Sequence, residues 1–237
     1  MSELFSIQLQ NRQQQGRDGV WLDLPTTTEQ VQAALRQIGI SSDNPQGLFI
    51  SGYFAEEEKR FAIPYNMVLA SNVDALNFLA AQLETLSAGE RAELNAALQA
   101  PQSELSSIGK ITDFPENVDY YVHLPDVTGT GQLGDYYLNR SGMVDMPEEW
   151  KAGIFLPRFG LHIANTEHGV FTDYGYLVKS GDEWQRVHEG QPVPEEYRVM
   201  AYPAPEILRD EAPARTDRKS TRLNSSHREK SRMPSSA

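Results

Sequence analysis

The stretch Gly19-Val-Trp-Leu-Asp-Leu-Pro-Thr-Thr-Thr-Glu29 predicts the fold class, because a strand pattern passes directly into a helix pattern. Val20 to Leu24 is typical of a short strand, and Pro25 ends it. Thr26 and Glu29 have the spacing of a capping box, which marks the start of a helix. The apolar residues that then fall on one helical face are Val31, Ala34, Leu35 and Ile38. The combination favours an α+β fold.

The neighbouring segments extend this pattern. Phe5 to Gln10 alternates apolar and polar residues, as a half-buried strand does, and Gly47 to Phe54 is predicted to be a third strand. Gly39 suits the end of the helix. We therefore expect residues 1–64 to form an N-terminal α+β domain.

From Ser71 to Gly109 the chain is rich in Ala, Leu and Glu. Leucines recur every three or four residues, Ser87 and Glu90 predict the start of a second helix, and Ser103 to Ile108 a further short turn. The leucine stripe favours a core over a partner-binding zipper, since a coiled coil needs about three or four heptads. We expect residues 65–110 to form a helical middle domain.

Strands and helices mix again after Ile111, so we expect residues 111–205 to form a C-terminal α+β domain in an elongated, three-domain molecule. The segments expected to be strands or hairpin arms are Val118–Leu124, Gly169–Val178, and Trp184–His188 paired with Tyr197–Tyr202. Those expected to be helical are Gln132–Asn139, closed by Gly142, and Pro147–Ile154. Residues 206–237 are expected to be a disordered tail.

The chain is acidic, with 33 Asp and Glu against 21 Lys and Arg and a net charge of −12. Residues 217–237 hold six of the basic residues and two of the acidic ones, which leaves 15 basic and 31 acidic residues in 1–216. That segment resembles a translated sequencing-library adapter, so we expect it to be an artefact. Such a negative charge disfavours contact with nucleic acid or anionic lipid and favours a basic protein partner.

The sequence offers weak support for catalysis. It has no cysteine, and its histidines, His123, His162, His168, His188 and His227, show no metal-ligand spacing, so we expect neither metal nor cofactor. The absence of a signal core and of a long apolar stretch predicts a cytoplasmic protein. Gly129 to Gly134 matches GxGxxG, but without a second βαβ unit we interpret it as a loop and helix cap. Paired carboxylates leave open a small hydrolase.

Three segments together resemble the ArdA family of antirestriction proteins. Arg158 to Leu177 contains Phe-Thr-Asp-Tyr-Gly-Tyr, Gly19 to Pro25 is similar to the family's early Gly-x-Trp-x-Asp-Leu-Pro strand, and Asn72 to Ala97 resembles its helical part. The resemblance covers roughly residues 4–180 of the chain. The segment Lys179 to Pro205 departs from the family by extending beyond its usual end.

The resemblance implies a dimeric acidic protein of mobile genetic elements that mimics DNA and occupies the DNA-binding groove of type I restriction–modification enzymes. It implies no catalysis and no cofactor. The candidate phosphate-mimicking acids are Glu56, Glu57, Glu58, Asp74, Glu84, Glu90, Glu93, Glu116, Asp119, Asp126, Asp135, Asp145, Glu148 and Glu149.

Two alternatives stay open for these residues. Any single acid is equally well explained as an ordinary hydrated charge. The protein as a whole is also consistent with an acidic interaction module of a mobile element that does not mimic DNA. Phe159, Leu161 and Phe171 are candidates for a dimer contact, although apolar residues like these are more often core.

Overall fold

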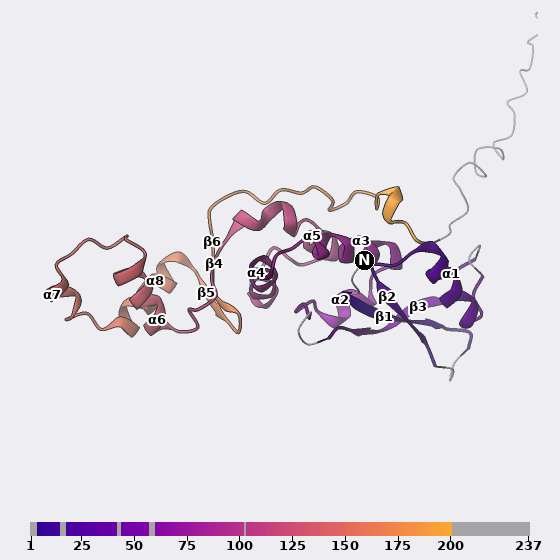
Figure 1. Ribbon diagram of the computed structural model, residues 1–237, viewed down its shortest axis with the longest axis horizontal. Helices are drawn as coiled ribbons and strands as arrows, with labels where there is room; N and C mark the ends of the chain where they lie inside the picture. The colour runs from indigo at the N-terminus through magenta and orange to yellow at the C-terminus, as the bar shows by residue number, and fades with distance from the viewer. Residues whose placement is uncertain (1–3, 15–17, 42–43, 57–59, 102, 201–237) are drawn as a thin grey trace, which may run out of the picture. The chain divides into compact units, whose positions relative to one another are not determined.

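The computed structural model describes residues 4–14, 18–41, 44–56, 60–101 and 103–200, and it begins with a three-stranded antiparallel sheet (Figure 1). The strand order is β2-β1-β3, with β1 at Phe5–Asn11, β2 at Val20–Leu24 and β3 at Leu48–Phe54. Side chains alternate between buried and half-buried along β1, as the period-two pattern predicted. The three predicted strands are therefore confirmed.

Helix α1, Thr28–Gln37, covers the buried face of this sheet with Val31, Ala34 and Leu35. Its capping box is formed by Thr27 and Gln30, one residue later than the predicted Thr26 and Glu29. The shift has a physical reason: the Thr26 amide donates to Asn77 Oδ1 at 2.7 Å, which holds Thr26 in the preceding connection. Gly39 follows the helix with φ of +69°, as expected of a helix-ending glycine.

The middle of the chain is helical, as predicted. Helices α2 (Tyr65–Leu69), α3 (Val73–Glu84) and α4 (Ala88–Gln99) share one core with the first sheet. The Ser87–Glu90 capping box of α4 is present. The predicted turn at Ser103–Ile108 lies too early, because the helix there, α5 (Ile108–Thr112), begins after its N-cap Ser107.

A second antiparallel sheet has the order β4-β6-β5, with β4 at Tyr121–Leu124, β5 at Val170–Thr172 and β6 at Gly175–Lys179. The predicted strand at Val118–Leu124 is confirmed only in its second half, because Phe114–Tyr120 forms the 3-10 helix η2. Strand β6 joins two cores, since Leu177 is part of the large cluster and Tyr176 of a smaller one with Val127, Leu133 and Ala164.

Two helices, α6 (Thr130–Asp135) and α8 (Leu156–Glu167), pack closely together. A Cβ at Gly134 would lie 2.2 Å from Leu156 O, and one at Gly160 would lie 1.8 Å from Thr130 O. The last glycine of the GxGxxG match thus serves helix packing. Gly129 is the N-cap of α6, as the cap interpretation expected.

The segments around α6 and α8 follow the sequence in part. A π-helical turn, η3 (Tyr136–Arg140), continues α6 as predicted, and α7 (Glu148–Lys151) is the core of the predicted helix at Pro147–Ile154. Helix α8 was not predicted. It ends at His168 in the left-handed region, φ 57°, after which β5 and β6 form a hairpin.

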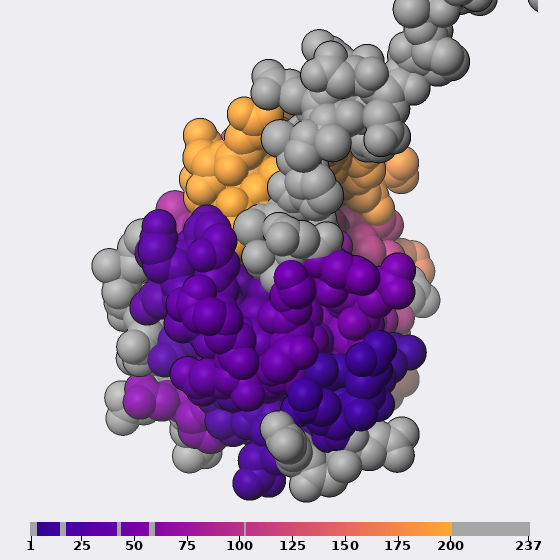
Figure 2. Space-filling view, turned by 90° about the vertical axis from the view of Figure 1, so that its right-hand side faces the viewer, coloured from indigo at the N-terminus to yellow at the C-terminus, as the bar shows by residue number. Residues whose placement is uncertain are grey.

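The expected strand pair of Trp184–His188 with Tyr197–Tyr202 is wrong in its described part. Within residues 180–200 the only regular element is the 3-10 turn η4 (Glu195–Tyr197), and Ala201 and Tyr202 lie outside the described residues. The chain here bonds to side chains of α3 and η2, and to Asp113 between α5 and η2, instead of to a partner strand. Figure 2 shows the orange part of this segment next to the purple N-terminal half.

The observed fold is α+β, as predicted. The described residues belong to a single compact unit, and the predicted tail, residues 206–237, lies outside them. The division at residues 64 and 110 and the nature of the tail stay predictions. Within the described ranges, no helix has both the length and the apolar character needed to cross a bilayer.

Candidate partner-binding surface

The structure brings several of the predicted acids together where α4 lies near η2. Glu90 and Glu93 belong to α4, and Glu116 and Asp119 belong to η2. Glu116 and Asp119 are exposed, whereas Glu90 and Glu93 are half-buried. The negative charges of Glu90 and Asp119 act on the Glu93 carboxyl. We call Glu90, Glu93 and Asp119 the α4–η2 acidic cluster.

Glu90 and Glu93 differ in charge state although they share one helix. Hydrogen bonds with Ser87 hold the pKa of Glu90 below its usual value, and the Ser87 amide lies 2.7 Å from Glu90 Oε2. Burial raises the pKa of Glu93 to about 7, with smaller contributions from Glu90 and Asp119. Glu93 Oε1 is buried without a hydrogen-bond partner among the described residues. Glu93 is therefore only a partial charge carrier at neutral pH.

A second group of exposed acids lies between β4 and α8. Asp126 follows β4, Asp145 precedes α7, and Glu148 and Glu149 form the first turn of α7. Glu148 is paired with Lys151 at 2.7 Å, so its charge is partly compensated. Glu56, beyond β3, is also exposed. These positions suit acids that meet a basic partner.

Asp74 does not suit that role. It is 5% exposed, and its Oδ1 accepts hydrogen bonds from the amides of Val199 at 2.8 Å and Met200 at 2.9 Å. A buried carboxylate engaged in this way stabilises the fold and cannot reach a partner. The expectation of an exposed charge at Asp74 was wrong because sequence periodicity does not reveal a distant segment that covers α3.

The remaining candidates are intermediate or undescribed. Asp135 is half-buried and forms an ion pair with Arg140 at 2.7 Å. Hydrogen bonds from Asn139 and then Arg140 lower the pKa of Asp135, so it stays ionised. Glu84 is half-buried on α3. Glu57 and Glu58 lie outside the described residues.

Sequence reasoning missed several exposed acids. Asp23 lies on the outer face of β2, where strand alternation places every second side chain, so the pattern itself could have identified it. Four others lie in the segment after β6, for which no sequence signal indicated the path of the chain: Asp182, Glu183, Glu195 and Glu196.

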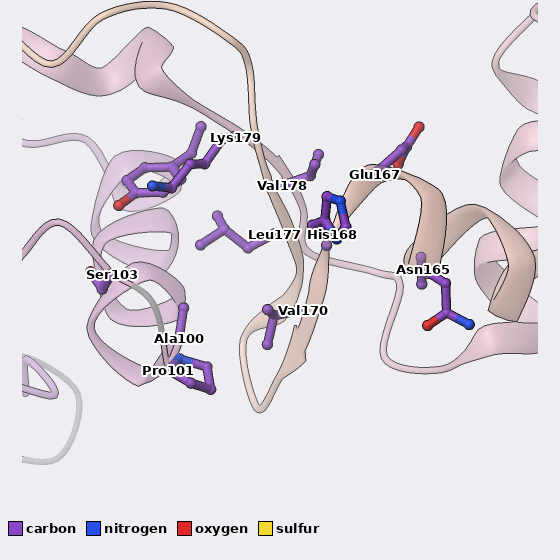
Figure 3. Close-up of a pocket in the computed structure, with 13 residues that line it drawn as sticks. Ala100, Pro101, Ser103, Asn165, Glu167, His168, Val170, Leu177, Val178 and Lys179 are labelled. Atoms are coloured by element: carbon purple, nitrogen blue, oxygen red, sulfur yellow. The ribbon is translucent and has the colours of Figure 1, made fainter.

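A pocket of about 540 Å³ lies between the end of α4, the end of α8 and the second sheet (Figure 3). Pro101, His168 and Lys179 are among its lining residues, and Lys179 is paired with Glu104 at 2.9 Å. Among the described residues that line it, the one acid is Glu167, which accepts hydrogen bonds from Tyr137 at 2.7 Å and Tyr176 at 3.3 Å. Burial and the Glu167 charge raise the pKa of both phenols, so they stay neutral donors.

This arrangement gives the hydrolase alternative no support. General acid–base hydrolysis of the kind considered needs two carboxyl groups in one pocket. The 540 Å³ pocket and one of about 380 Å³ beside it, which contains Asp173, hold one acid each. Among the described residues, no group of three or more His, Asp or Glu is placed to hold a metal ion.

Comparison with known families gives a direct assignment. The family model described as "Antirestriction protein (ArdA)" matches residues 15–178, which is more than half of the chain. No curated protein matches the sequence. The match includes Gly19–Pro25, α3, α4 and the Arg158–Leu177 block, and it ends within β6.

Proposed function

The chain belongs to the ArdA family of antirestriction proteins, and from this premise we propose that it inhibits type I restriction–modification enzymes by mimicking DNA. The observation that carries the proposal is the family match over residues 15–178. Antirestriction follows from the family, while the mechanism and the target enzyme are our proposal.

The charge of the surface supports a mimic. Exposed carboxylates at Glu116, Asp119, Asp126, Asp145 and Glu149 offer negative charge without burying it. A DNA-binding groove carries Lys and Arg that contact phosphates, and the displacement of ions from such contacts makes binding strongly dependent on salt. Each exposed pair contributes little, about 0.2 to 1 kcal/mol. We therefore assign the binding energy to many acids acting together, with Asp74 left out of the set.

We also propose that the protein acts as a homodimer. Large apolar side chains are exposed between α6 and the end of α8: Met143 is 72% exposed, Trp150 68%, Phe155 71% and Leu161 49%. Exposed apolar residues in such density indicate a contact surface. Leu161 was one of the predicted dimer residues. Phe159 is half-buried, and Phe171 packs against the smaller core, so both are weaker candidates.

Competition for the enzyme tests the mechanism. A fluorescent duplex with a recognition site is bound to a type I restriction–modification enzyme, and the full chain is titrated in at several salt concentrations. A mimic displaces the duplex, and its apparent inhibition constant weakens steeply as salt rises.

Two outcomes would separate the alternatives. Binding to the enzyme without displacement of the duplex would contradict DNA mimicry and favour the interaction module. Displacement with no dependence on salt would contradict an electrostatic mechanism. For the dimer, sedimentation of Trp150→Ser should give a smaller species than the unaltered chain, and an unchanged mass would contradict this use of Trp150.

A further inference from the structure

The segment Ser180–Met200 follows β6 and lies beyond the residues that match the family. It has no strand or α-helix, yet it is held firmly at its two ends. The Ser180 amide donates to Tyr120 O at 2.9 Å, which fixes its start to the last residue of η2. At its other end, Val199 and Met200 are 4% and 6% exposed and belong to the large core. Figure 1 shows the extended course of this segment past α5 and α3.

Its first set of contacts is with two buried polar side chains near η2. The carboxylate of Asp113, which is fully buried, accepts hydrogen bonds from the His188 amide and from the Glu189 amide at 3.3 Å. Asn117 accepts from the Gln185 amide at 2.7 Å and donates to Gln185 O at 2.9 Å. Since burying a carboxylate costs free energy unless it is hydrogen-bonded, Asp113 depends on this segment for its partners.

Its second set of contacts is with α3. Asp74 accepts from the Val199 and Met200 amides, and Asn77 donates to Tyr197 O at 3.0 Å. Asn77 also accepts from the Thr26 amide. One amide side chain thus joins the segment, α3 and the connection between β2 and α1.

Ring contacts add packing between these two sets. Trp184 lies edge-on to Tyr120, with ring centroids 5.1 Å apart. Phe78 of α3 contacts His188 at 4.9 Å and Tyr197 at 4.7 Å. Aromatic pairs of this kind add about 0.5 to 1.5 kcal/mol beyond the area they bury. The segment is therefore anchored by hydrogen bonds and rings along most of its length.

The second sheet also meets the large core directly, through the buried side chains of Tyr121 and Leu177, and it meets the end of α4 through a polar contact. Gln99 of α4 forms two hydrogen bonds with Asp173. Gln99 Nε2 donates to the Asp173 carboxylate at 3.1 Å, and the Asp173 backbone amide donates to Gln99 Oε1 at 3.0 Å. Gln99 and Asp173 line the pocket of about 380 Å³, which shares Pro101 and Val170 with the pocket of about 540 Å³. These hollows are open to solvent, so apolar packing holds only part of the boundary between the sheet and α4.

We propose that Ser180–Met200 is an intramolecular clasp that holds the β4-β6-β5 sheet in one orientation relative to α3 and the first sheet. The clasp follows β6 and connects it to Asp113, to η2, to α3 and, through Asn77, to the β2–α1 connection. Tyr121 and Leu177 pack the sheet against the large core on one part of this boundary, and the clasp adds a second attachment that opposes rotation at the hollowed part. This role concerns the fold and holds whatever the target of the protein is.

The absence of cysteine makes a distance measurement straightforward. Spin labels are attached to the full chain at Arg36→Cys on α1 and His162→Cys on α8, both exposed positions. The clasp is weakened by Asp113→Asn with Asn117→Ala, because an amide at position 113 can accept from only one of the N–H groups of His188 and Glu189 and turns a donor toward the other. The control is Glu116→Gln with Asp119→Asn, two exposed changes on the same 3-10 helix.

We expect a single narrow distance distribution for the unaltered chain and the control, and a distribution at least about twice as broad for the weakened clasp. Hydrogen exchange is measured in parallel. The amides of His188, Glu189, Val199 and Met200 should exchange at least about tenfold faster in the variant, while those of Ile7 and Leu9 in β1 stay protected.

Three results would overturn the proposal. The first is a distance distribution as narrow as that of the unaltered chain although the amides of Ser180–Met200 exchange faster. The segment would then have detached without any effect on the orientation of the sheet. Another is continued protection of those amides, since Asp113 and Asn117 would then not hold the segment. The third concerns a double variant that also loses protection in β1, which would mean that the whole fold is destabilised. The single variant Asp113→Asn is then measured instead, and a distance distribution unchanged from that of the unaltered chain would contradict the proposal.

Discussion

Glu93 is an acid of the candidate surface whose carboxyl is partly protonated at neutral pH, so it contributes less than a full negative charge. It lies in the α4–η2 acidic cluster, but burial raises its pKa to about 7, and its Oε1 has no hydrogen-bond partner among the described residues. The unfolded chain has an ordinary glutamate pKa near 4.5. Between these two values the folded protein binds more protons, so stability falls as pH rises from about 4.5 through about 7.

We predict that Glu93→Gln removes this loss. The free energy of unfolding in urea is measured at pH 5 and at pH 8. Its decrease between the two pH values should be smaller in the variant by about 1 to 2 kcal/mol, after allowance for solvent screening at a partly exposed site. Glu149→Gln, which is exposed on α7, is the control and should leave the pH dependence unchanged. An equal pH dependence in Glu93→Gln and the unaltered chain would contradict the buried, proton-binding state.

Gly160 is required for close packing of α6 against α8. Because a Cβ there would lie 1.8 Å from Thr130 O and 2.7 Å from the Gly134 amide, backbone would have to move. We predict that Gly160→Ala destabilises the fold by about 2 kcal/mol or more in thermal or urea unfolding. Gly89→Ala is the matched control, since nothing lies within 4 Å of its added Cβ. That variant should be neutral or stabilising by up to about 1 kcal/mol, and equal losses in both would refute the packing argument.

Helices and strands whose causes lie within a few residues are predictable from the sequence, whereas those that depend on distant contacts are not. The Ser87–Glu90 capping box and the alternation of β1 depend on residues a few positions apart, so the sequence contains the whole cause. The α1 cap shifted by one residue because Thr26 is held by Asn77, which is 51 positions away. Local pattern cannot show such a bond.

The C-terminal half shows the same limit for whole elements. Helix α8 was missed because its burial comes from packing against α6, through glycines rather than a stripe of large apolar residues. The strand pair expected in 184–202 was wrong because side chains of α3 and η2 satisfy that backbone. For the candidate surface, sequence identified which residues are acidic but not that Asp74 is covered.

Asn95 performs for α4 a role like that of Asn77 for α3. Its Oδ1 accepts from the Ala62 amide at 2.7 Å, and its Nδ2 donates to Arg60 O at 3.2 Å. We predict that Asn95→Ala costs about 2 to 3 kcal/mol of unfolding free energy, because two backbone groups lose their partners. Asn165→Ala, exposed on α8, should cost less than about 0.5 kcal/mol. A similar small effect at both positions would show that Asn95 does not anchor the segment after β3.

The number of exposed, unpaired acids distinguishes a DNA mimic from a protein that is merely acidic. Acids outnumber bases by 31 to 15 in residues 1–216. Several candidates are nevertheless weakened as charge carriers: Asp74 is buried, Glu93 is partly protonated, and Asp135 and Glu148 are paired. The exposed acids therefore differ in what their removal should do, and this difference can be measured.

We predict that neutralising Glu116, Asp119 and Asp126 together with Glu149, as Gln and Asn, weakens competition with duplex DNA by about fourfold to a thousandfold, given about 0.2 to 1 kcal/mol for each exposed contact. The slope of the logarithm of the inhibition constant against the logarithm of salt concentration should become shallower at the same time. The control neutralises Asp135 and Glu148, whose charges are already paired with Arg140 and Lys151. It removes two acids yet should change the inhibition constant less per charge. A mimic must place free carboxylates where the partner's cations lie, so removal of a free acid should weaken inhibition more than removal of a paired one. Equal losses per charge would mean that only the total charge of the protein matters, and would contradict mimicry.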